Sequence, residues 1–437
     1  MTSSRRIFVK AHRWGSFALG VLLLVVVLSG VILLLAPEIE QLTHPSLYDT
    51  ASGPAKLTPG EALAVVHKEL PEFETAGAST YENRGAWEVH SPSGEVARVD
   101  DTDGKLLGTI DREHGFMAFL ANLHECGLTC EGESGYVGFL NKPAQIWGFD
   151  LTLGSEGTWG GFILGVSALL LLVLVLTGLW IWWPRGSWRR GLAVRRALLI
   201  RHGKGRYKFH YDLHKVVGFI AIPALAMWAI TGLNFEFPKT IEGAYYAVTP
   251  GSPAPESIYE FESKPGSGPG ITMPQAIAAA RAVVPDGSHL DSVSNPERSE
   301  EGSYYELWFG SGIDTYRYSE YPGNFGVYVD RYSGEARQFF PNPDNATTSN
   351  EFMQNWWAGL HMGFLVGWLP RLAWVAFGLT PLLLAITGVV TWVIRRRRGR
   401  RRGRRGEPED DPELDVEDFG EDEAVAADEE DDVGAPA

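Results

Sequence analysis

The chain has 437 residues, 45% of them hydrophobic, and a formal net charge of −16 at pH 7. The residues beyond Arg405 account for all of this charge, because they include 16 acids and no base. Net charge therefore excludes no fold or partner for the rest of the chain. The tail itself is too charged and too poor in apolar residues to form a core, so we expect it to be disordered and solvated.

Four blocks hold most of the apolar residues, and this uneven distribution excludes an ordinary soluble protein. A helix needs roughly 20 residues to cross a hydrocarbon layer of about 30 Å, and each block reaches that length. The first is too long for the hydrophobic region of a signal peptide and has no A-x-A cleavage site before Pro37, so we expect it to be retained. The blocks are Ser16–Ala36, Gly160–Trp183, Val216–Phe237 and Trp368–Ile394.

Basic residues predict the orientation, because short cytoplasmic loops collect Lys and Arg. Bases precede the first block, the loop Pro184–Phe209 carries nine bases and no acid, and the fourth block ends in RRRRGRRRGRR. All three basic flanks are cytoplasmic only if both termini are inside the cell. Segments 38–158 and 238–358 then face the periplasm or the cell exterior of a bacterial cytoplasmic (inner) membrane.

An internal repeat divides the chain into two halves. His12 lies 18 residues before Gly30, and His214 lies 18 residues before Gly232. Eighteen residues make five helical turns, so each His shares a helix face with its distant Gly, about 27 Å away. Each Gly follows a hydroxyl residue. The second and fourth blocks carry similar pairs, Thr177-Gly178 and Thr387-Gly388.

The two outer segments also repeat. LTPGEALAVV from Leu57 and ITMPQAIAAA from Ile271 each predict a helix that opens with a capping box. Strand patterns follow both: AWEVH and EVARVDDTDGKLLG in the first segment, YYELWF and GVYVDRYSGEARQF in the second. Each segment is thus predicted to form a small α+β module with one helix and an antiparallel sheet.

Together these features resemble the PepSY-associated transmembrane family. The resemblance rests on the paired His openings, the Ser/Thr-Gly pairs, the LWIWWPR exit at Leu179–Arg185 and the repeated outer modules, and it covers about residues 5–398. That family includes iron-regulated membrane proteins and haem-containing ferric siderophore reductases. The resemblance implies a membrane α-helical fold: a four-helix transmembrane bundle with two extracytoplasmic α+β PepSY-like modules and a disordered acidic C-terminal tail.

We therefore expect eight segments along the chain. They are residues 1–37 (N-terminal segment and first spanning helix), 38–158 (first module, with an insertion), 159–184 (second spanning helix), 185–213 (basic cytoplasmic loop), 214–237 (third spanning helix), 238–358 (second module), 359–394 (fourth spanning helix) and 395–437 (basic, then acidic, disordered cytoplasmic tail).

Four histidines lie at or near the ends of spans, where an ionisable side chain is costly and usually faces a bundle interior or a cavity. His12 and His214 begin outgoing helices, whereas His124 and His361 precede returning ones. Neutral imidazole ligates haem iron, and two axial His give a six-coordinate b-type haem suited to electron transfer. We expect two haem b groups, an inner one held by His12 and His214 and an outer one held by His124 and His361. The alternative for each His alone is a helix anchor at the lipid headgroups.

Four glycines are expected to face these ligands. Gly178 and Gly388 should lie beside the inner pair, and Gly30 and Gly232 beside the outer pair, where a missing side chain leaves room for a flat macrocycle. The alternative is that small residues merely allow close helix packing.

Two ligand assignments stay open. His210 lies four residues before His214 on the same helix face, so either could bind the inner haem. The 18-residue spacing favours His214, with His210 in a supporting role. In the first half 54 residues separate His124 from Gly178, twice the 27 residues of the second half. An insertion therefore lies between the ligand and its helix, which leaves the position of His124 open.

The two cysteines, Cys126 and Cys130, lie in this insertion, on the oxidising side of the membrane. We expect a disulfide between them, with metal binding or redox chemistry as the alternative. No CxxCH motif is present, so covalent c-type haem is not expected.

The resemblance implies a haem-dependent transmembrane reductase that passes electrons outward to ferric iron in a siderophore or other chelate. No flavin or nicotinamide motif has supporting context, so the electrons must come from a separate donor, a cytoplasmic reductase or a quinol. Membrane lipid is a further expected partner, and no nucleic acid is expected. The alternatives are a non-enzymatic PepSY protein whose modules bind a peptide, a protease or a transporter, and a haem transporter.

Overall fold

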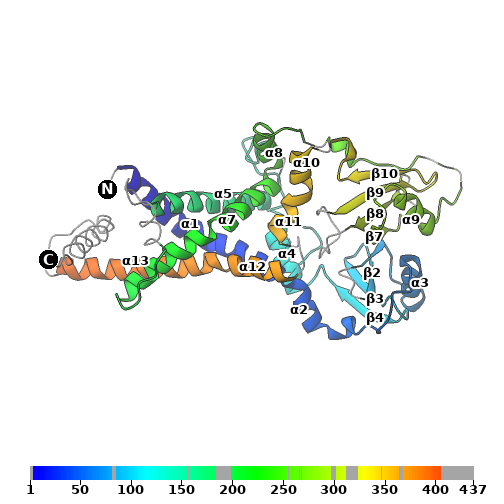
Figure 1. Ribbon diagram of the computed structural model, residues 1–437, viewed down its shortest axis with the longest axis horizontal. Helices are drawn as coiled ribbons and strands as arrows, with labels where there is room; N and C mark the ends of the chain where they lie inside the picture. Colours follow the sequence, from blue (N-terminus) through cyan, green and yellow to red (C-terminus); the bar gives the residue numbers. More distant parts are fainter. Residues whose placement is uncertain are drawn as a thin grey trace, which may run out of the picture. The chain divides into compact units, whose positions relative to one another are not determined.

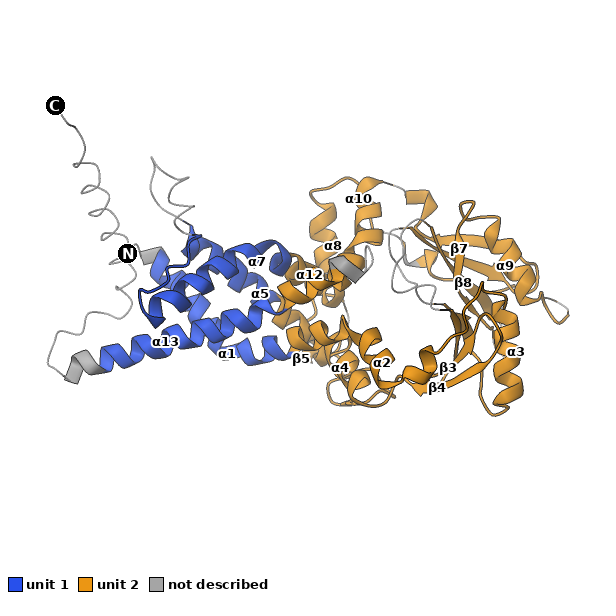
Figure 2. Cartoon of the chain, turned by 60° about the horizontal axis from the view of Figure 1, so that its bottom comes forward, with its two compact units in different colours: residues 1–25, 169–226, 379–437 blue, residues 26–168, 227–378 orange. Residues whose placement is uncertain are grey.

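The computed structural model describes residues 3–80, 85–155, 157–183, 198–253, 255–264, 266, 268–296, 302–311, 323–345, 347–363 and 368–404. Part of the basic loop, residues 184–197, and the acidic tail, residues 405–437, lie outside these ranges. The chain forms two compact units, coloured in Figure 2. The first contains residues 1–25, 169–226 and 379–437, and the second contains residues 26–168 and 227–378.

Four helices in the described ranges are long and apolar enough to cross a membrane, as predicted. Three of them are α1 (Ser3–Leu33), α5 (Trp159–Trp182) and α7 (Arg206–Glu236). The fourth, expected as one block, is divided at Leu379 into α12 (Trp368–Gly378) and α13 (Thr380–Arg404). Pro381 explains the division, because it lacks an amide hydrogen and its ring would clash with the carbonyl four residues earlier in a continuous helix.

The fourth span also ends later than expected. Helix α13 continues to Arg404, so residues 395–404, expected to belong to a disordered tail, are helical. Arginine has a high helix propensity, and cations near a helix C-terminus interact favourably with the helix dipole. The arginine run therefore extends the helix beyond its apolar part.

The two predicted modules share one antiparallel sheet, with strand order β10-β9-β8-β7-β1-β2-β3-β4 (Figure 1). Its strands are β1 (Gly77–Ser79), β2 (Ala86–His90), β3 (Glu95–Asp100), β4 (Leu106–Asp111), β7 (His289–Ser294), β8 (Tyr304–Gly310), β9 (Asn324–Asp330) and β10 (Ala336–Phe340). The halves join where Ala78 on β1 pairs with Val293 on β7. The sequence did not predict β1 or β7, because neither has the length and apolar alternation of a strand signal.

Each half of the sheet is covered by its own helix, α3 (Pro59–Glu69) or α9 (Met273–Arg281) (Figure 1). Both predicted capping boxes are confirmed: Thr58 with Glu61, and Thr272 with Gln275. Small residues on each helix pack against apolar residues of the strands. The first core contains Ala62, Val66, Ala78, Val89, Ala97 and Val99, and the second contains Ala276, Ala280, Val293, Leu307, Phe309, Val327 and Val329.

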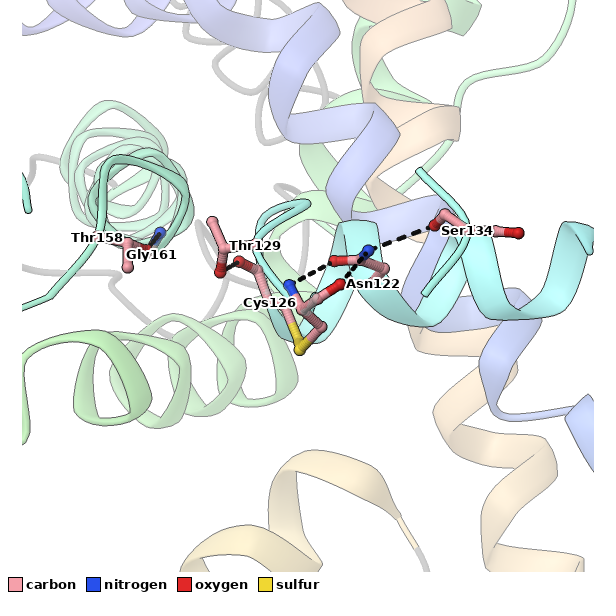
Figure 3. Close-up of a disulfide and its surroundings, with 7 residues drawn as sticks. Asn122, Cys126, Thr129, Ser134, Thr158 and Gly161 are labelled. Carbon is pink, nitrogen blue, oxygen red and sulfur yellow. Dashed lines mark hydrogen bonds between the residues drawn. A yellow bond between two sulfur atoms is a disulfide. The ribbon is translucent and has the colours of Figure 1, made fainter. Parts of the chain in front are cut away.

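Shorter elements connect the sheet to the spanning helices. They are α2 (Ala36–Thr43), a 3-10 turn (Pro45–Tyr48), α4 (Phe116–Glu125), β5 (Gln145–Ile146), β6 (Phe149–Asp150), α8 (Pro238–Tyr246), α10 (Thr348–Glu351), a π-helical turn (Phe352–Trp356) and α11 (Trp357–Met362). The structure joins Cys126 and Cys130 in a disulfide just after α4 (Figure 3). Asn122 on α4 donates its side-chain amide to the carbonyls of Cys130 and Ser134, which ties this loop to the helix.

A buried network of charges links α2 to the sheet. Arg98 and Glu88, both 1% exposed, form an ion pair at 2.5 Å. Arg112 donates to Glu88 at 2.7 Å and to Glu40 on α2 at 2.9 Å, and Tyr48 donates to Glu40 at 2.5 Å. Burial alone would raise the pKa of Glu40, but the hydrogen bonds and charge of Arg112 outweigh it and hold that pKa below its usual range.

Glu88→Gln should lower the free energy of unfolding by about 3–5 kcal/mol, because it leaves buried arginine charge without a full partner. Thermal unfolding of the detergent-solubilised protein measures the effect. Lys68→Ala, which removes an exposed pair with Glu69, is the control and should leave the melting temperature unchanged. A Glu88→Gln variant as stable as the parent would contradict the role of Glu88 in the network.

The lowered pKa of Glu40 also makes stability depend on pH. Its stabilising contribution is fully present above the pKa of Glu40 in the unfolded chain, and it is lost as the pH falls through the lower pKa of the folded protein.

Candidate functional site

Two histidines from different spanning helices face each other in the first compact unit. His12 lies on α1 and His214 on α7, and their imidazole centroids are 6.3 Å apart with the ring planes at 87°. Both side chains are half-buried. The structure thus brings together the two residues expected as the inner ligands, called the first pair below.

A threonine hydroxyl holds each ring of the first pair. Thr177 Oγ1 lies 3.0 Å from Nδ1 of His12, and Thr387 Oγ1 lies 3.0 Å from Nδ1 of His214. The glycine after each threonine lies against the same ring, where an added Cβ would be 3.4 Å and 3.6 Å from the imidazole Cε1 atoms. Each Thr-Gly pair therefore forms a flat, polar seat for one imidazole.

The same arrangement recurs in the second unit. His124 on α4 and His361 on α11 form a second pair, with centroids 6.2 Å apart and ring planes at 44°. Ser29 Oγ lies 3.3 Å from Nδ1 of His124, and Thr231 Oγ1 lies 2.7 Å from Nδ1 of His361. Trp228 Nε1 donates to the carbonyl of His361 at 2.9 Å, which fixes the backbone of α11 beside α7.

The glycines of the second pair differ in how closely the rings approach. A Cβ added at Gly30 would lie 2.5 Å from Cε1 of His124, which is too close for any side chain. At Gly232 the nearest atom of His361 would be 3.8 Å away, an ordinary contact. Glycine is therefore strictly required at position 30, whereas at the other three positions an added Cβ would make an ordinary van der Waals contact with the imidazole.

The hydroxyl groups determine which imidazole nitrogen carries the hydrogen. A hydroxyl has a single hydrogen, and all four donate it to a carbonyl in the preceding turn of their own helix. Thr231, for example, donates to the carbonyl of Met227 at 2.8 Å. The hydroxyl oxygen can then only accept from the ring, so in the neutral imidazole Nδ1 carries the hydrogen and Nε2 keeps its lone pair.

Two backbone carbonyls require the same tautomer. Nδ1 of His124 lies 2.7 Å from the carbonyl oxygen of Val26, and Nδ1 of His214 lies 3.0 Å from that of Leu384. A carbonyl oxygen only accepts hydrogen bonds, so both Nδ1 atoms must be donors. A neutral imidazole held through Nδ1–H is the usual form of a histidine that binds a metal through Nε2.

The ring spacing in each pair would accommodate one metal ion between two imidazoles whose Nε2 atoms face each other. An imidazole nitrogen lies about 1.1 Å from the ring centroid and about 2.0–2.1 Å from a bound metal, so opposed rings should be about 6.2–6.4 Å apart. The observed separations are 6.3 Å and 6.2 Å. No group of three or more His, Cys, Asp or Glu suited to a metal occurs in the described ranges. A six-coordinate ion here would need four further ligands, which a planar macrocycle supplies.

Some buried polar nitrogens on the helices of the first pair and its seats have no hydrogen-bond partner in the described part of the chain, among them Arg5 Nε, Trp182 Nε1 and His210 Nδ1. Their offsets from His12, Gly178 and His214 are seven, four and four residues, so each shares a helix face with a residue of the first pair or its seat. The structure pairs His12 with His214, and the ring of His210 contacts Phe209 instead.

The four hydroxyl residues are the part of the site that sequence reasoning missed. We expected them only as neighbours of glycine, whereas each contacts an imidazole Nδ1. Their signal was the fourfold recurrence of a hydroxyl before a glycine. They are Ser29, Thr177, Thr231 and Thr387.

The family model of the PepSY-associated TM region matches residues 9–395 of the chain's sequence. The chain belongs to this family. The match spans both histidine pairs and all four hydroxyl-glycine pairs, and it confirms the resemblance drawn from the motifs. No curated protein matches the chain. As a PepSY-associated TM protein with four apolar helices, it is a multi-pass membrane protein.

Gly30→Ala should destabilise the protein by about 1–3 kcal/mol, because the new methyl group would overlap the His124 ring. Gly20→Ala is the matched control on α1, since a Cβ there meets nothing within 4 Å; it should be neutral or slightly stabilising. Melting temperatures in detergent compare the two.

A double-mutant cycle tests the cause. In a His124→Ala background the clash partner is gone, so Gly30→Ala should cost much less. An equal cost in both backgrounds would show that the ring of His124 does not lie against Gly30.

Proposed function

We propose that the protein is a dihaem b-type electron-transfer protein of the membrane, with His12 and His214 holding one iron and His124 and His361 the other. The supporting observation is the repeated geometry of the two pairs, with centroids 6.3 Å and 6.2 Å apart, Nδ1 held by a hydroxyl and Nε2 available. A haem iron with two axial imidazoles exchanges single electrons and has no position left for oxygen.

The surroundings of the first pair also suit the carboxylates of a haem. Arg5 offers a cation, and Trp182 and His210 offer ring nitrogens. The Nε atom of Arg5, Nε1 of Trp182 and Nδ1 of His210 are buried without a hydrogen-bond partner among the described residues. At 1.5 Å per residue they lie roughly 6–10 Å along their helices from the ligand level. In the second unit, Nε1 of Trp357 is also buried without a hydrogen-bond partner among the described residues, and Trp357 lies four residues before His361. These groups would orient the carboxylate edge of each macrocycle.

The hydroxyl seats fix one tautomer of the neutral imidazole, and the neutral form suits a membrane interior where charge is costly. Because each hydroxyl hydrogen is already donated to a helix carbonyl, the ring cannot exchange its tautomer without losing a hydrogen bond. Fixed, neutral ligands need no proton movement when an electron arrives. The chain's part in electron transfer would therefore be to hold two redox groups through His12, His214, His124 and His361 without a change of ligand.

We place the second pair on the extracytoplasmic side, because bases flank the opposite ends of the spanning helices. Electrons would leave there for ferric iron in a siderophore or other chelate, a one-electron reduction that needs no acid or base residue. The donor would be a separate cytoplasmic reductase or a membrane quinol. The protein would lie in a bacterial cytoplasmic membrane with both termini inside.

His361→Ala should lower haem content from about two per chain towards one while the other haem keeps its spectrum, and His12→Ala or His214→Ala should do the reverse. The pyridine haemochrome assay on purified protein gives the content. His67→Ala and His289→Ala, which change histidines outside both pairs, should leave it unchanged. Purified protein without a Soret band would favour the peptide-, protease- or transporter-binding alternative, and readily exchanged haem would favour haem transport.

Thr231→Val should weaken binding of the haem at the second pair by about 10–100-fold, because it removes the acceptor for Nδ1–H of His361. Thr231→Ser keeps the hydroxyl and should retain parental affinity. Ser167→Ala is the control, since this hydroxyl also donates within a spanning helix and, among the described residues, no hydrogen bond joins it to a histidine. Competition with apomyoglobin measures the affinity. Equal affinities for the valine and serine variants would remove the hydroxyl from the ligand's support.

A further inference from the structure

A small hairpin before α5 exposes large apolar side chains. Ile146 on β5 pairs with Phe149 on β6, and Trp147 lies between them at the tip. These side chains are 45%, 68% and 102% exposed, and Phe139 and Leu153 nearby are 66% and 58% exposed. Several large apolar side chains exposed within one short segment indicate contact with a membrane or with another protein.

The turn of the hairpin holds its tryptophan outward in an unfavourable backbone conformation. Trp147 and Gly148 have φ angles of 50° and 78°, the left-handed region used by both central residues of a type I′ turn. Asparagine or glycine fits this region well, whereas a bulky aromatic residue seldom occupies it. Such strain at a fully exposed side chain points to a contact outside the chain.

The hairpin has little of the charge that keeps the modules soluble. Within residues 137–155 the charged residues are Lys142 and Asp150. The carboxylate of Asp150 is turned back into the chain, where it accepts hydrogen bonds from the amides of Thr152 and Gly154 at 2.8 Å and 2.6 Å. The apolar tip therefore carries no free acid, and the one lysine has a stem long enough to reach a headgroup.

Backbone hydrogen bonds fix the hairpin to the first turn of a spanning helix. The amides of Trp159 and Gly160, at the start of α5, donate to the carbonyls of Lys142 and Leu140, both at 3.0 Å. Thr158 caps the same turn by accepting from the amide of Gly161 at 3.1 Å (Figure 3). Amides in a first helical turn lack helical partners, so this attachment satisfies α5 and holds the hairpin beside the first turn of a helix that is long and apolar enough to cross a membrane.

We propose that residues 137–153 insert into the interfacial layer of the lipid bilayer on the side of the modules. Tryptophan and phenylalanine are favoured where acyl chains meet headgroups. The hairpin is attached to a helix that crosses this layer, so lipid is the surface its apolar tip meets first.

Insertion would also set the depth of the second histidine pair. The amide of Val137 donates to the carbonyl of Leu128, and the amide of Leu128 donates to the carbonyl of Asn122 on α4, both at 2.9 Å. This chain of bonds connects the lipid-facing hairpin to the helix that carries His124. An inserted hairpin would thus keep α4 at the level of the membrane surface, whether or not the histidines bind haem.

Site-directed spin labelling of the full chain tests the proposal. The two native cysteines are joined in a disulfide, so Trp147→Cys and Phe149→Cys each introduce one reactive thiol, which mass spectrometry can verify as one label per chain. Lys68→Cys, at a lysine side chain that is 79% exposed on α3, is the control. The labelled proteins are reconstituted in vesicles of phosphatidylcholine and phosphatidylglycerol.

Power saturation then compares relaxation by oxygen, which partitions into lipid, with relaxation by a water-soluble nickel chelate. Labels at positions 147 and 149 should respond several-fold more to oxygen, and the label at position 68 should respond more to nickel. A nickel-dominated response at both hairpin positions would overturn the proposal. Protection from both reagents would overturn it in favour of a protein partner, and spin–spin broadening would identify that partner as a second copy of the chain.

Discussion

One hydrogen atom on each of four hydroxyl groups constrains the rest of the site. It is donated to the carbonyl one turn earlier in the helix, so the hydroxyl oxygen accepts from an imidazole. The imidazole is then protonated at Nδ1 and presents the lone pair of Nε2. A histidine side chain in a free rotamer would have two tautomers and a titratable charge. Held in this way, the neutral ring has a single tautomer, and its orientation is set by the helix that carries the hydroxyl.

A hydroxyl-glycine pair contacts an imidazole in both halves of the chain because the spanning helices repeat in sequence. Eighteen residues separate His12 from Gly30 and His214 from Gly232, and five full turns return each helix to the same face. A helix that carries a histidine of one pair near its start thus seats a histidine of the other pair near its end. The 54-residue separation in the first half does not alter this, since α4 still places His124 against Gly30.

Local patterns were predictable from the sequence, and long-range pairing was not. The capping boxes at Thr58 and Thr272 and strands such as β2 follow from residues close in the chain. The single sheet depends on Ala78 meeting Val293, two short strands without a periodic signal. The seats at Gly30 and Gly232 were visible as spacings, but the contacts of Ser29 and Thr231 with imidazole nitrogens depend on rotamers that a spacing does not specify.

The account depends on each pair holding one metal between two imidazoles. Low-temperature electron paramagnetic resonance of the oxidised, purified protein tests this most directly, because low-spin ferric iron with two axial imidazoles has a distinctive spectrum. We expect two such signals of equal intensity, distinguishable because the ring planes meet at 87° in one pair and 44° in the other. A protein with no low-spin ferric signal, or with high-spin iron alone, would contradict the assignment.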